Sequence, residues 1–204
     1  MPIIGLCGFK GSGKDTVADM LVNTSNYKKI AFADFIRNAA KELFDWDDSS
    51  FDANNKEKVD EYWNVTPRKI LQELGTEFLR IHCKDILSTE FELPNGEKHN
   101  ATFHIKRINK DVIKLLNSNN KNIIFSDIRF QDELDYIKKL GGTIIKVVRP
   151  SLSNNEFSQH VSEQNIDKLQ NIDYELVNEH NLQHLYKKTS LIVEHIEADL
   201  LHGH

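Results

Sequence analysis

A glycine-rich loop near the start of the chain constrains the fold more than any other feature of the sequence. The loop runs from Gly8 to Lys14, follows the apolar run Ile3–Cys7 and precedes a segment whose apolar residues recur at helical spacing. A strand, a loop of this spacing and a helix form a P-loop, in which backbone N–H groups, the helix N-terminus and the lysine bind phosphates. The sequence therefore predicts that a nucleoside triphosphate binds at these residues: Lys10, Gly11, Ser12, Gly13, Lys14, Asp15 and Thr16.

The residue after Lys14 departs from the general P-loop pattern. Ser or Thr is expected there, because its hydroxyl binds Mg²⁺, but the sequence has Asp15 followed by Thr16. A carboxylate oxygen of Asp15 suits a hard cation, directly or through a water. Thr16 points about 100° further round the helix, so it replaces the missing hydroxyl only if the helix is distorted. The metal ligand is left open between these two residues.

Short apolar runs alternate with segments of helical spacing along the chain. The runs are continuous rather than alternately apolar and polar, which is typical of strands buried on both faces of a parallel sheet. The predicted strands are Ile3–Cys7, Lys29–Ala33, Asn122–Ser126, Thr143–Val148 and Tyr174–Val177. A chain of 204 residues suits one domain. We therefore expect a single α/β domain, residues 1–204, with a parallel sheet and helices on both of its faces.

A helix predicted to begin at Thr66 carries candidate ligand-binding residues. Thr66 supplies a capping hydroxyl, and Pro67 suits the first helical position. Gly75 lies within this helix, although glycine costs a helix about 1 kcal/mol relative to alanine. These features suggest close approach of a planar, phosphorylated ligand; the alternative is a solvated polar face on which the glycine has no role. Four polar residues share the face opposite the apolar one: Arg68, Gln72, Thr76 and Arg80.

Asp127 and Arg129 follow a predicted buried strand. The carboxyl ends of parallel strands border the ligand crevice of open α/β sheets. Asp127 could orient Mg²⁺ or its water shell, and the donor fork of Arg129 suits a phosphoryl group under transfer. The alternative is a surface ion pair between two residues that are two positions apart.

Taken in order, these motifs resemble the deoxynucleoside monophosphate kinases of large DNA phages and viruses. The resemblance extends over about residues 3–196, nearly the whole chain, and it includes the Lys-Asp-Thr end of the P-loop. The matching segments are Gly8–Thr16, Leu71–Glu77, Asp127–Leu134, Gly141–Pro150 and His160–Glu163.

The resemblance implies a P-loop kinase fold in which ATP, with Mg²⁺, phosphorylates a deoxynucleoside 5′-monophosphate to the diphosphate. An inserted helical region of about residues 34–120 would bind the acceptor. The expected catalytic residues are Lys14, Asp127 and Arg129, the expected metal ligands are Asp15 and Asp127, and Arg149 is a further ATP-binding residue.

The acceptor nucleotide has its own expected contacts under this resemblance. Its phosphate would lie against Arg37, Arg68 and Arg129, and its base would face Gln72, Thr76 and Arg80. The identity of the base is left open. The full set of acceptor-binding residues is Arg37, Arg68, Gln72, Gly75, Thr76, Arg80, Asp127, Arg129 and Glu133.

Composition excludes several other classes of protein. The net charge of −5 is opposite to the balance of duplex-binding proteins, so no nucleic-acid partner is expected. No apolar run approaches the about 20 residues of a membrane span, and the first residues lack the pattern of a signal peptide. The two cysteines make no disulfide framework. We therefore expect a cytoplasmic protein (in the host cytoplasm if viral), a monomer or homodimer, whose partners are small-molecule nucleotides.

Two other functions are left open. One is another small-molecule P-loop kinase, acting for example on a coenzyme precursor or on phosphomevalonate. The other is a nucleotide-binding module without catalytic activity, which the presence of Lys14 and Arg129 disfavours.

Two segments have no settled role in the sequence. The acidic stretch Asp45–Asp60 is expected to be a solvated excursion. The segment His160–Glu163 either shapes a loop near the ATP ribose or base, or has a purely structural capping role.

Overall fold

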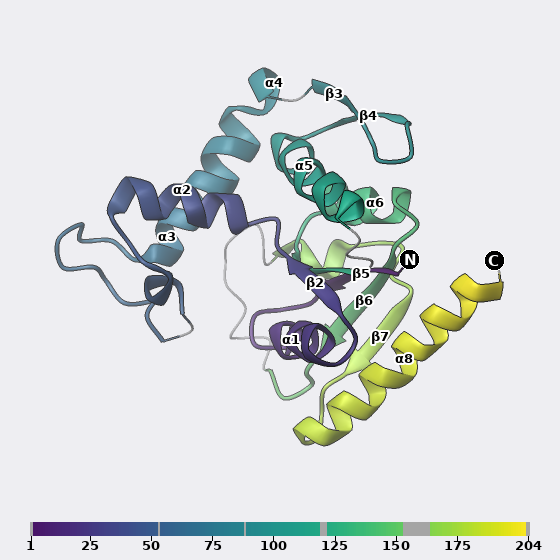
Figure 1. Cartoon of the computed structure of the whole chain (residues 1–204). Coiled ribbons are helices and arrows are strands. Elements are labelled where there is room, and N and C mark those ends of the chain that lie inside the picture. The colour runs from purple at the N-terminus through teal and green to yellow at the C-terminus, as the bar shows by residue number, and fades with distance from the viewer. Residues whose placement is uncertain (1, 53, 88, 119–121, 153–163, 203–204) are drawn as a thin grey trace.

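The chain forms a five-stranded parallel sheet (Figure 1). The structure is a computed structural model that describes residues 2–52, 54–87, 89–118, 122–152 and 164–202. Every neighbouring pair of strands is parallel, and the order is β2-β5-β1-β6-β7. The predicted parallel α/β sheet is therefore confirmed. Its strands are β1 (Ile3–Cys7), β2 (Tyr27–Ile30), β5 (Asn122–Ile128), β6 (Thr143–Val148) and β7 (Tyr174–Val177).

Helices cover both faces of this sheet, and each face has its own core. In Figure 1, α5 (Phe103–Asn117) and α6 (Gln131–Lys139) lie above the sheet, and α1 (Lys14–Thr24) and α8 (Leu182–His202) lie below it. Along β1, Ile3 and Cys7 belong to the core with α5 and α6. Ile4 and Leu6 belong to the core with α1 and α8. Because side chains alternate across a strand, a strand between two cores is apolar at successive positions, as the sequence runs are.

The second strand ends earlier than the sequence predicts. β2 spans Tyr27–Ile30, whereas the apolar run predicts a strand over Lys29–Ala33. The backbone N–H groups of Phe32 and Ala33 donate to the carboxylate of Asp127, at 2.7 and 3.0 Å, instead of to a neighbouring strand. The prediction was wrong at this strand because the apolar residues after Ile30 are buried in a turn, where a carboxylate takes the place of a strand partner.

Between β2 and β5 the chain leaves the sheet and forms a group of short elements. The predicted helix start is confirmed, since the hydroxyl of Thr66 accepts the backbone N–H of Lys69 at 3.1 Å and Pro67 is the first helical residue. The α-helical part is short, however, and continues as a π-helix. The elements are α2 (Asp34–Phe44), the 3₁₀-helix η1 (Asp48–Phe51), α3 (Pro67–Gln72), the π-helix η2 (Glu73–His82), α4 (Lys84–Leu87) and an antiparallel hairpin of β3 (Thr89–Glu92) and β4 (Lys98–Ala101). A 3₁₀-turn, η4 (Ile166–Lys168), precedes β7.

The acidic stretch Asp45–Asp60 is anchored to α2 and α3 by apolar side chains. Most of its acidic side chains are exposed, as expected of a solvated segment. Trp46 and Phe51 are buried, however, and pack in a small core with residues of α2 and α3. The segment is therefore a solvated excursion, as expected, and two aromatic residues fix it against the helices.

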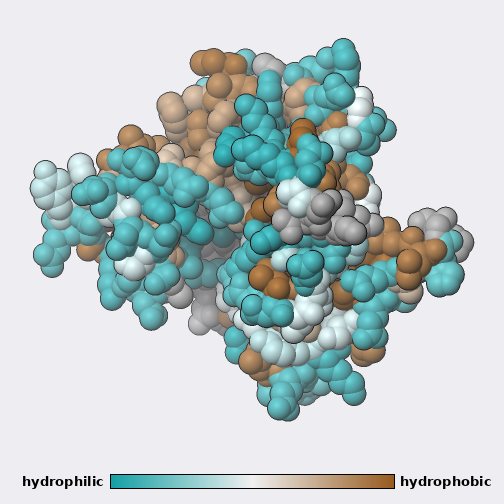
Figure 2. Space-filling view, in the orientation of Figure 1, coloured by the Kyte–Doolittle hydropathy of each residue, from teal (hydrophilic) through white to brown (hydrophobic). Residues whose placement is uncertain are grey.

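The surface is largely hydrophilic in Figure 2, with hydrophobic areas over η2 and α4 and at the C-terminal end of α8. The exposed apolar residues of these elements include Phe78, Ile81, Ile86, Leu200 and Leu201. Within the part of the chain that the structure describes, no helix has both the length and the apolar character to cross a membrane.

Candidate active site

The loop from Gly8 to Lys14 joins β1 to α1 and has the backbone of a phosphate-binding loop. Gly8, Gly11 and Gly13 have φ angles of 141°, 79° and 108°, in the region that favours glycine. A Cβ on Gly8 would also lie 2.3 Å from the carbonyl oxygen of Val147, so only glycine lets the loop pass this close to β6. α1 begins at Lys14, and its N-terminus therefore meets the loop, as predicted.

Lys14 and Ser12 carry polar groups that suit a triphosphate. The Nζ of Lys14 donates to the carbonyl oxygens of Gly8 and Phe9, at 2.6 and 2.8 Å. The Oγ of Ser12 is buried and has no hydrogen-bond partner among the described residues. A buried polar group without a partner costs about 1–3 kcal/mol, and a phosphate oxygen in the loop would satisfy this hydroxyl. The loop therefore fits the ligand that its sequence predicts.

A cavity of about 530 Å³ beside the loop brings most of the predicted site together. Its lining carries eight basic and four acidic side chains, so the cavity is locally positive although the whole chain has a net charge of −5. A cavity of this charge attracts phosphorylated ligands. The basic residues are Lys10, Lys14, Lys29, Arg37, Lys56, Arg68, Arg80 and Arg129, and the acidic residues are Asp15, Asp34, Asp127 and Glu133. Of the predicted site residues, Ser12, Gly13, Thr16 and Arg149 do not line the cavity.

α3 and η2 present the predicted polar face to this cavity: Arg68, Gln72, Thr76 and Arg80 all line it. In a straight α-helix each four-residue step overshoots a turn by about 40°, so Arg68 and Arg80 would diverge by about 120°. In η2 the hydrogen bonds run to the fifth residue, a turn holds more residues, and a four-residue step falls short of a turn. The angular overshoot of the step in α3 and the angular shortfall of the steps in η2 offset each other. The π-helix therefore keeps the four side chains directed to one cavity.

Gly75 lines the same cavity but is not required by packing. A Cβ on Gly75 would meet side-chain atoms of Ile36 in α2 at 3.6 Å, an ordinary contact distance. The close approach of a ligand to Gly75 therefore stays a prediction.

Arg80 and Glu133 connect η2 to the corner between β5 and α6. The Nη1 of Arg80 donates to both carboxylate oxygens of Asp132 at 2.8 Å, and its Nη2 donates to Glu133. The guanidinium also lies 3.8 Å from the ring centroid of Phe130. The second oxygen of Glu133 accepts the backbone N–H groups of Arg129 and Phe130, at 2.8 and 3.2 Å. Desolvation raises the pKa of Glu133 to about 8, against the opposing effect of Arg80. The pair therefore holds the backbone that carries Arg129.

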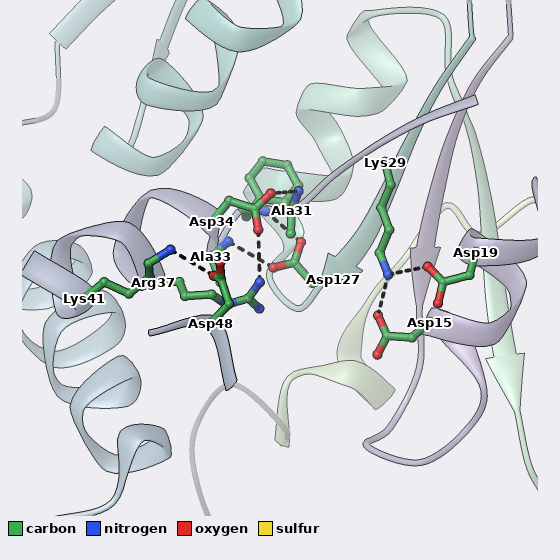
Figure 3. A network of polar contacts seen from close by, with 11 residues as sticks. Asp15, Asp19, Lys29, Ala31, Ala33, Asp34, Arg37, Lys41, Asp48 and Asp127 are labelled. Atoms are coloured by element: carbon green, nitrogen blue, oxygen red, sulfur yellow. Dashed lines mark hydrogen bonds and ion pairs between the residues drawn. The ribbon is translucent and has the colours of Figure 1, made fainter. Parts of the chain in front are cut away.

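Asp127 lies inside β5, one residue past the predicted end of that strand, and points to the turn after β2 (Figure 3). Its two carboxylate oxygens accept the backbone N–H groups of Phe32 and Ala33. Burial raises the pKa of Asp127, and the two backbone donors oppose this rise. The carboxylate thus fixes the turn that leads into α2, and its predicted roles toward metal and substrate stay predictions.

Asp15 lies on the first turn of α1 and is 81% exposed. It pairs with Lys29 at 3.1 Å, and Lys29 also pairs with Asp19 at 2.9 Å (Figure 3). Among the described residues, no three His, Cys, Asp or Glu side chains form a group that could hold a metal ion. A cation beside Asp15 would therefore need further oxygen ligands from phosphates or water, which is the usual pattern for Mg²⁺.

Two residues of the acidic stretch enter the site, and no sequence motif indicates them. Glu57 pairs with Lys10 of the P-loop at 2.6 Å and also with Arg68 of α3. Lys56 lines the cavity, and its pKa is lowered by desolvation and by the charges of Arg68 and Lys10. Lys29 and His104 also line the cavity without a sequence signal.

Three other predicted positions differ in how they relate to the cavity. Arg37 in α2 lines it, and its buried Nε has no hydrogen-bond partner among the described residues. Arg149 is exposed after β6; Leu152, three residues later, lies against Gly11 of the P-loop. The segment His160–Glu163 lies outside the described residues.

The parallel sheet, the phosphate-binding loop and the positive cavity define the class of P-loop nucleotide-binding proteins. A family model described as "Deoxynucleotide monophosphate kinase" matches residues 48–189. A "Putative deoxynucleotide monophosphate kinase" of Acanthamoeba polyphaga mimivirus is 34% identical over 191 residues, which cover 92% of this chain and 94% of that protein. The chain therefore belongs to the deoxynucleotide monophosphate kinase family and is a nucleotide kinase, which confirms the resemblance found in its sequence.

Two more distant similarities, one in sequence and one in structure, accompany this match. The "Deoxynucleotide monophosphate kinase" of Enterobacteria phage T4 is 25% identical over 130 residues, which cover 64% of this chain and 45% of that protein. The solved structure of TT1252 from Thermus thermophilus is 17% identical and superimposes with a TM-score of 0.50, covering 98% of this chain and 97% of that one. The second similarity shows the fold alone.

Proposed function

We propose that this kinase transfers the γ-phosphoryl group of ATP to a deoxynucleoside 5′-monophosphate, and that the two nucleotides meet in the cavity beside the P-loop. One observation carries the proposal: the same cavity is lined by Lys14 of the P-loop, by Arg68 of α3 and by Arg129 after β5. Phosphoryl transfer requires that donor and acceptor phosphates lie close together and in line in a positive environment. The volume of about 530 Å³ is within the range of small-molecule sites.

ATP would bind at the loop residues Lys10–Thr16, where Lys14 and the unpartnered hydroxyl of Ser12 meet its phosphates. Arg149 would contact the nucleotide from the segment after β6. Mg²⁺ bound with ATP would neutralise charge on its phosphates. Asp15 suits this ion best, because it is exposed on the first turn of α1, and Asp127 would hold a water of its shell.

The region of about residues 34–120 would form the acceptor site within a single domain. Arg37, Arg68 and Arg129 would hold the acceptor phosphate, and the buried Nε of Arg37 is a donor that this phosphate would satisfy. The base would lie toward Gln72, Thr76 and Arg80, beside Gly75 and Glu133, which also line the cavity.

Arg129 would act on the moving phosphoryl group. Glu133 holds the backbone N–H of Arg129 at 2.8 Å, so the residue starts from a fixed position. A pre-placed guanidinium fork can bind the redistributed charge of the transition state better than either substrate. A cytoplasmic location, small-molecule nucleotides as partners and a monomeric or homodimeric state complete the proposal.

A coupled assay of ADP formation with ATP and each deoxynucleoside and ribonucleoside monophosphate tests this function. The Arg68→Ala variant should raise the KM of the acceptor at least about tenfold, as expected for the loss of a charged phosphate contact, with the KM of ATP nearly unchanged. Lys69→Ala is the matched control, since Lys69 lies next to Arg68, pairs with Glu73 and does not line the cavity. ADP formation that no nucleoside monophosphate stimulates would refute the proposed function. A rise in the KM of ATP alone would show that the two sites are assigned the wrong way round.

A further inference from the structure

Among the described residues that line the cavity, two have a buried polar side-chain atom without a hydrogen-bond partner, Arg37 and His104, and only that of His104 is not assigned to a phosphate above. His104 is the second residue of α5, its side chain lines the cavity, and the residue is only 5% exposed. Its Nδ1 has no hydrogen-bond partner among the described residues. Buried polar atoms in native proteins are nearly always paired, by protein, water or ligand. An unpaired ring nitrogen in the wall of a substrate cavity therefore points to a polar group of a ligand.

Aromatic side chains hold the His104 ring in a fixed orientation. Phe35 of α2 packs edge-on against it, with ring centroids 5.3 Å apart, and Phe103 lies at 6.3 Å. These contacts come from two different helices, so the ring cannot turn away from the cavity without disturbing both. A ring that packing holds in place loses little entropy when it forms a hydrogen bond with a ligand.

The His104 ring is uncharged at neutral pH. Burial, and next the charge of Arg80, lower its pKa to about 3, although Asp132 and the backbone carbonyl of Gly75 act in the other direction. A neutral imidazole has one donor and one acceptor nitrogen and adds no charge. It is therefore unsuited to hold a phosphate and well suited to a neutral polar group.

The position of His104 agrees with this chemistry. The groups proposed above to bind phosphates are Lys10 and Lys14 in the P-loop and the guanidinium groups of Arg37, Arg68 and Arg129. The charge of Arg80 is paired with Asp132 and Glu133. His104 belongs instead to the part of the wall formed by α5 and η2, close to Gly75 and Arg80. A nucleoside monophosphate has an anionic end and a neutral, planar, polar end, and the second end matches this part of the wall.

We propose that His104 hydrogen-bonds the edge of the acceptor base through Nδ1 and so helps to decide which bases the kinase accepts. The inference rests on the proposed acceptor site and adds to it a residue that determines specificity. The bases present different donors and acceptors along their edges. A single ring nitrogen of fixed orientation therefore favours some bases and leaves an unpaired polar contact with others, which lowers their turnover.

The test compares kcat/KM for dAMP, dCMP, dGMP and dTMP at saturating ATP in the wild type and in His104→Phe. Phenylalanine keeps a ring between Phe35 and Phe103 and removes both ring nitrogens, so the hydrogen bond with the backbone carbonyl of Gly75 is lost for every base alike. The ratio between the best and the worst base should fall at least about tenfold, with the KM of ATP unchanged. Phe103→Leu is the control, because it alters the same aromatic cluster, does not line the cavity and should keep the ranking of the bases. An equal loss for all four bases, or an unchanged ranking, would refute the inference.

A second measurement uses the wild-type protein and does not depend on the folding of a variant. In protein labelled with ¹⁵N at histidine, the Nδ1 resonance of His104, assigned with His104→Gln, should shift when the best dNMP is added without ATP. Inorganic phosphate alone should leave that resonance in place. A shift with phosphate, or none with the dNMP, would overturn the inference, whereas failure of the proposed function would appear separately as the absence of wild-type turnover.

Discussion

Replacement of His104 by phenylalanine should make the protein less sensitive to acid. In the folded chain, burial and the charge of Arg80 lower the pKa of His104 to about 3 from its ordinary value of 6.5. Between these values the unfolded chain binds a proton that the folded chain does not. The free energy of unfolding therefore falls as the pH falls below 6.5, and by pH 3 the contribution of this one ring amounts to roughly 4 kcal/mol.

The accessible part of this effect lies between pH 7 and pH 5. Over that interval, proton uptake by His104 in the unfolded chain alone lowers the free energy of unfolding by about 2 kcal/mol. Urea unfolding at several pH values would measure it in the wild type and in His104→Phe. The variant should lose about 2 kcal/mol less over this interval, whatever its stability at pH 7.

A histidine outside the cavity supplies the control. His82 is exposed at the end of η2, so His82→Gln removes one imidazole without removing a buried one. The loss in the free energy of unfolding of His82→Gln between pH 7 and pH 5 should match that of the wild type. Parallel curves for the wild type and His104→Phe would show that the ring is hydrated or charged in the folded protein, and the reasoning would be refuted.

Three further predictions concern the reaction. Lys14→Ala should lower kcat at least about a hundredfold while the circular dichroism spectrum is unchanged, because the positive charge that contacts the transferring phosphoryl group is lost. A folded variant with more than about a tenth of wild-type kcat would contradict this role. Arg129→Lys keeps the charge and loses the forked pair of donors of the guanidinium. The kcat should therefore fall by roughly 10²–10³, while the KM values of ATP and of the acceptor stay within a few-fold of wild type. An unchanged kcat with a large rise in KM would show that Arg129 acts in ground-state binding only. Glu57→Gln should lower the KM of the acceptor by up to about fivefold, since the exposed ion pairs of Glu57 with Lys10 and Arg68 must open when phosphates bind. Glu61→Gln, at an exposed position four residues later, is the control and should leave the KM unchanged. An unchanged KM in Glu57→Gln would mean that the ion pairs persist when phosphates bind.

The local sequence was sufficient to predict the sheet and the phosphate-binding loop. A strand buried between two cores must be apolar at successive positions, and β1, β5, β6 and β7 all lie where such runs occur. The loop between Gly8 and Lys14 was also predictable, because the positive φ angles that close it require glycine at set positions. Both features depend on residues that are neighbours in the chain.

The sequence predicted the polar face of α3 and η2 but not the geometry that makes it work. Helical spacing of four indicated that Arg68, Gln72, Thr76 and Arg80 share a face, and all four line the cavity. The π-helix that keeps Arg68 and Arg80 aligned has no comparable sequence signal. η2 contacts α4 and α5 as well as α3, and such tertiary contacts do not show in the local sequence.

The remaining features were decided by tertiary structure alone. β2 stops at Ile30 because carboxylates take the next backbone N–H groups. Asp34 accepts the N–H of Ala31, and Asp127, 95 residues away from Phe32, accepts those of Phe32 and Ala33. Glu57 reaches Lys10 across 47 residues, and His104 enters the cavity from the start of α5. A polar side chain in a loop or on a helix has the same local pattern whether it faces solvent or a ligand. Only the packing of distant segments determines which of the two it meets, because burial and charge are properties of the assembled cavity and not of the segment.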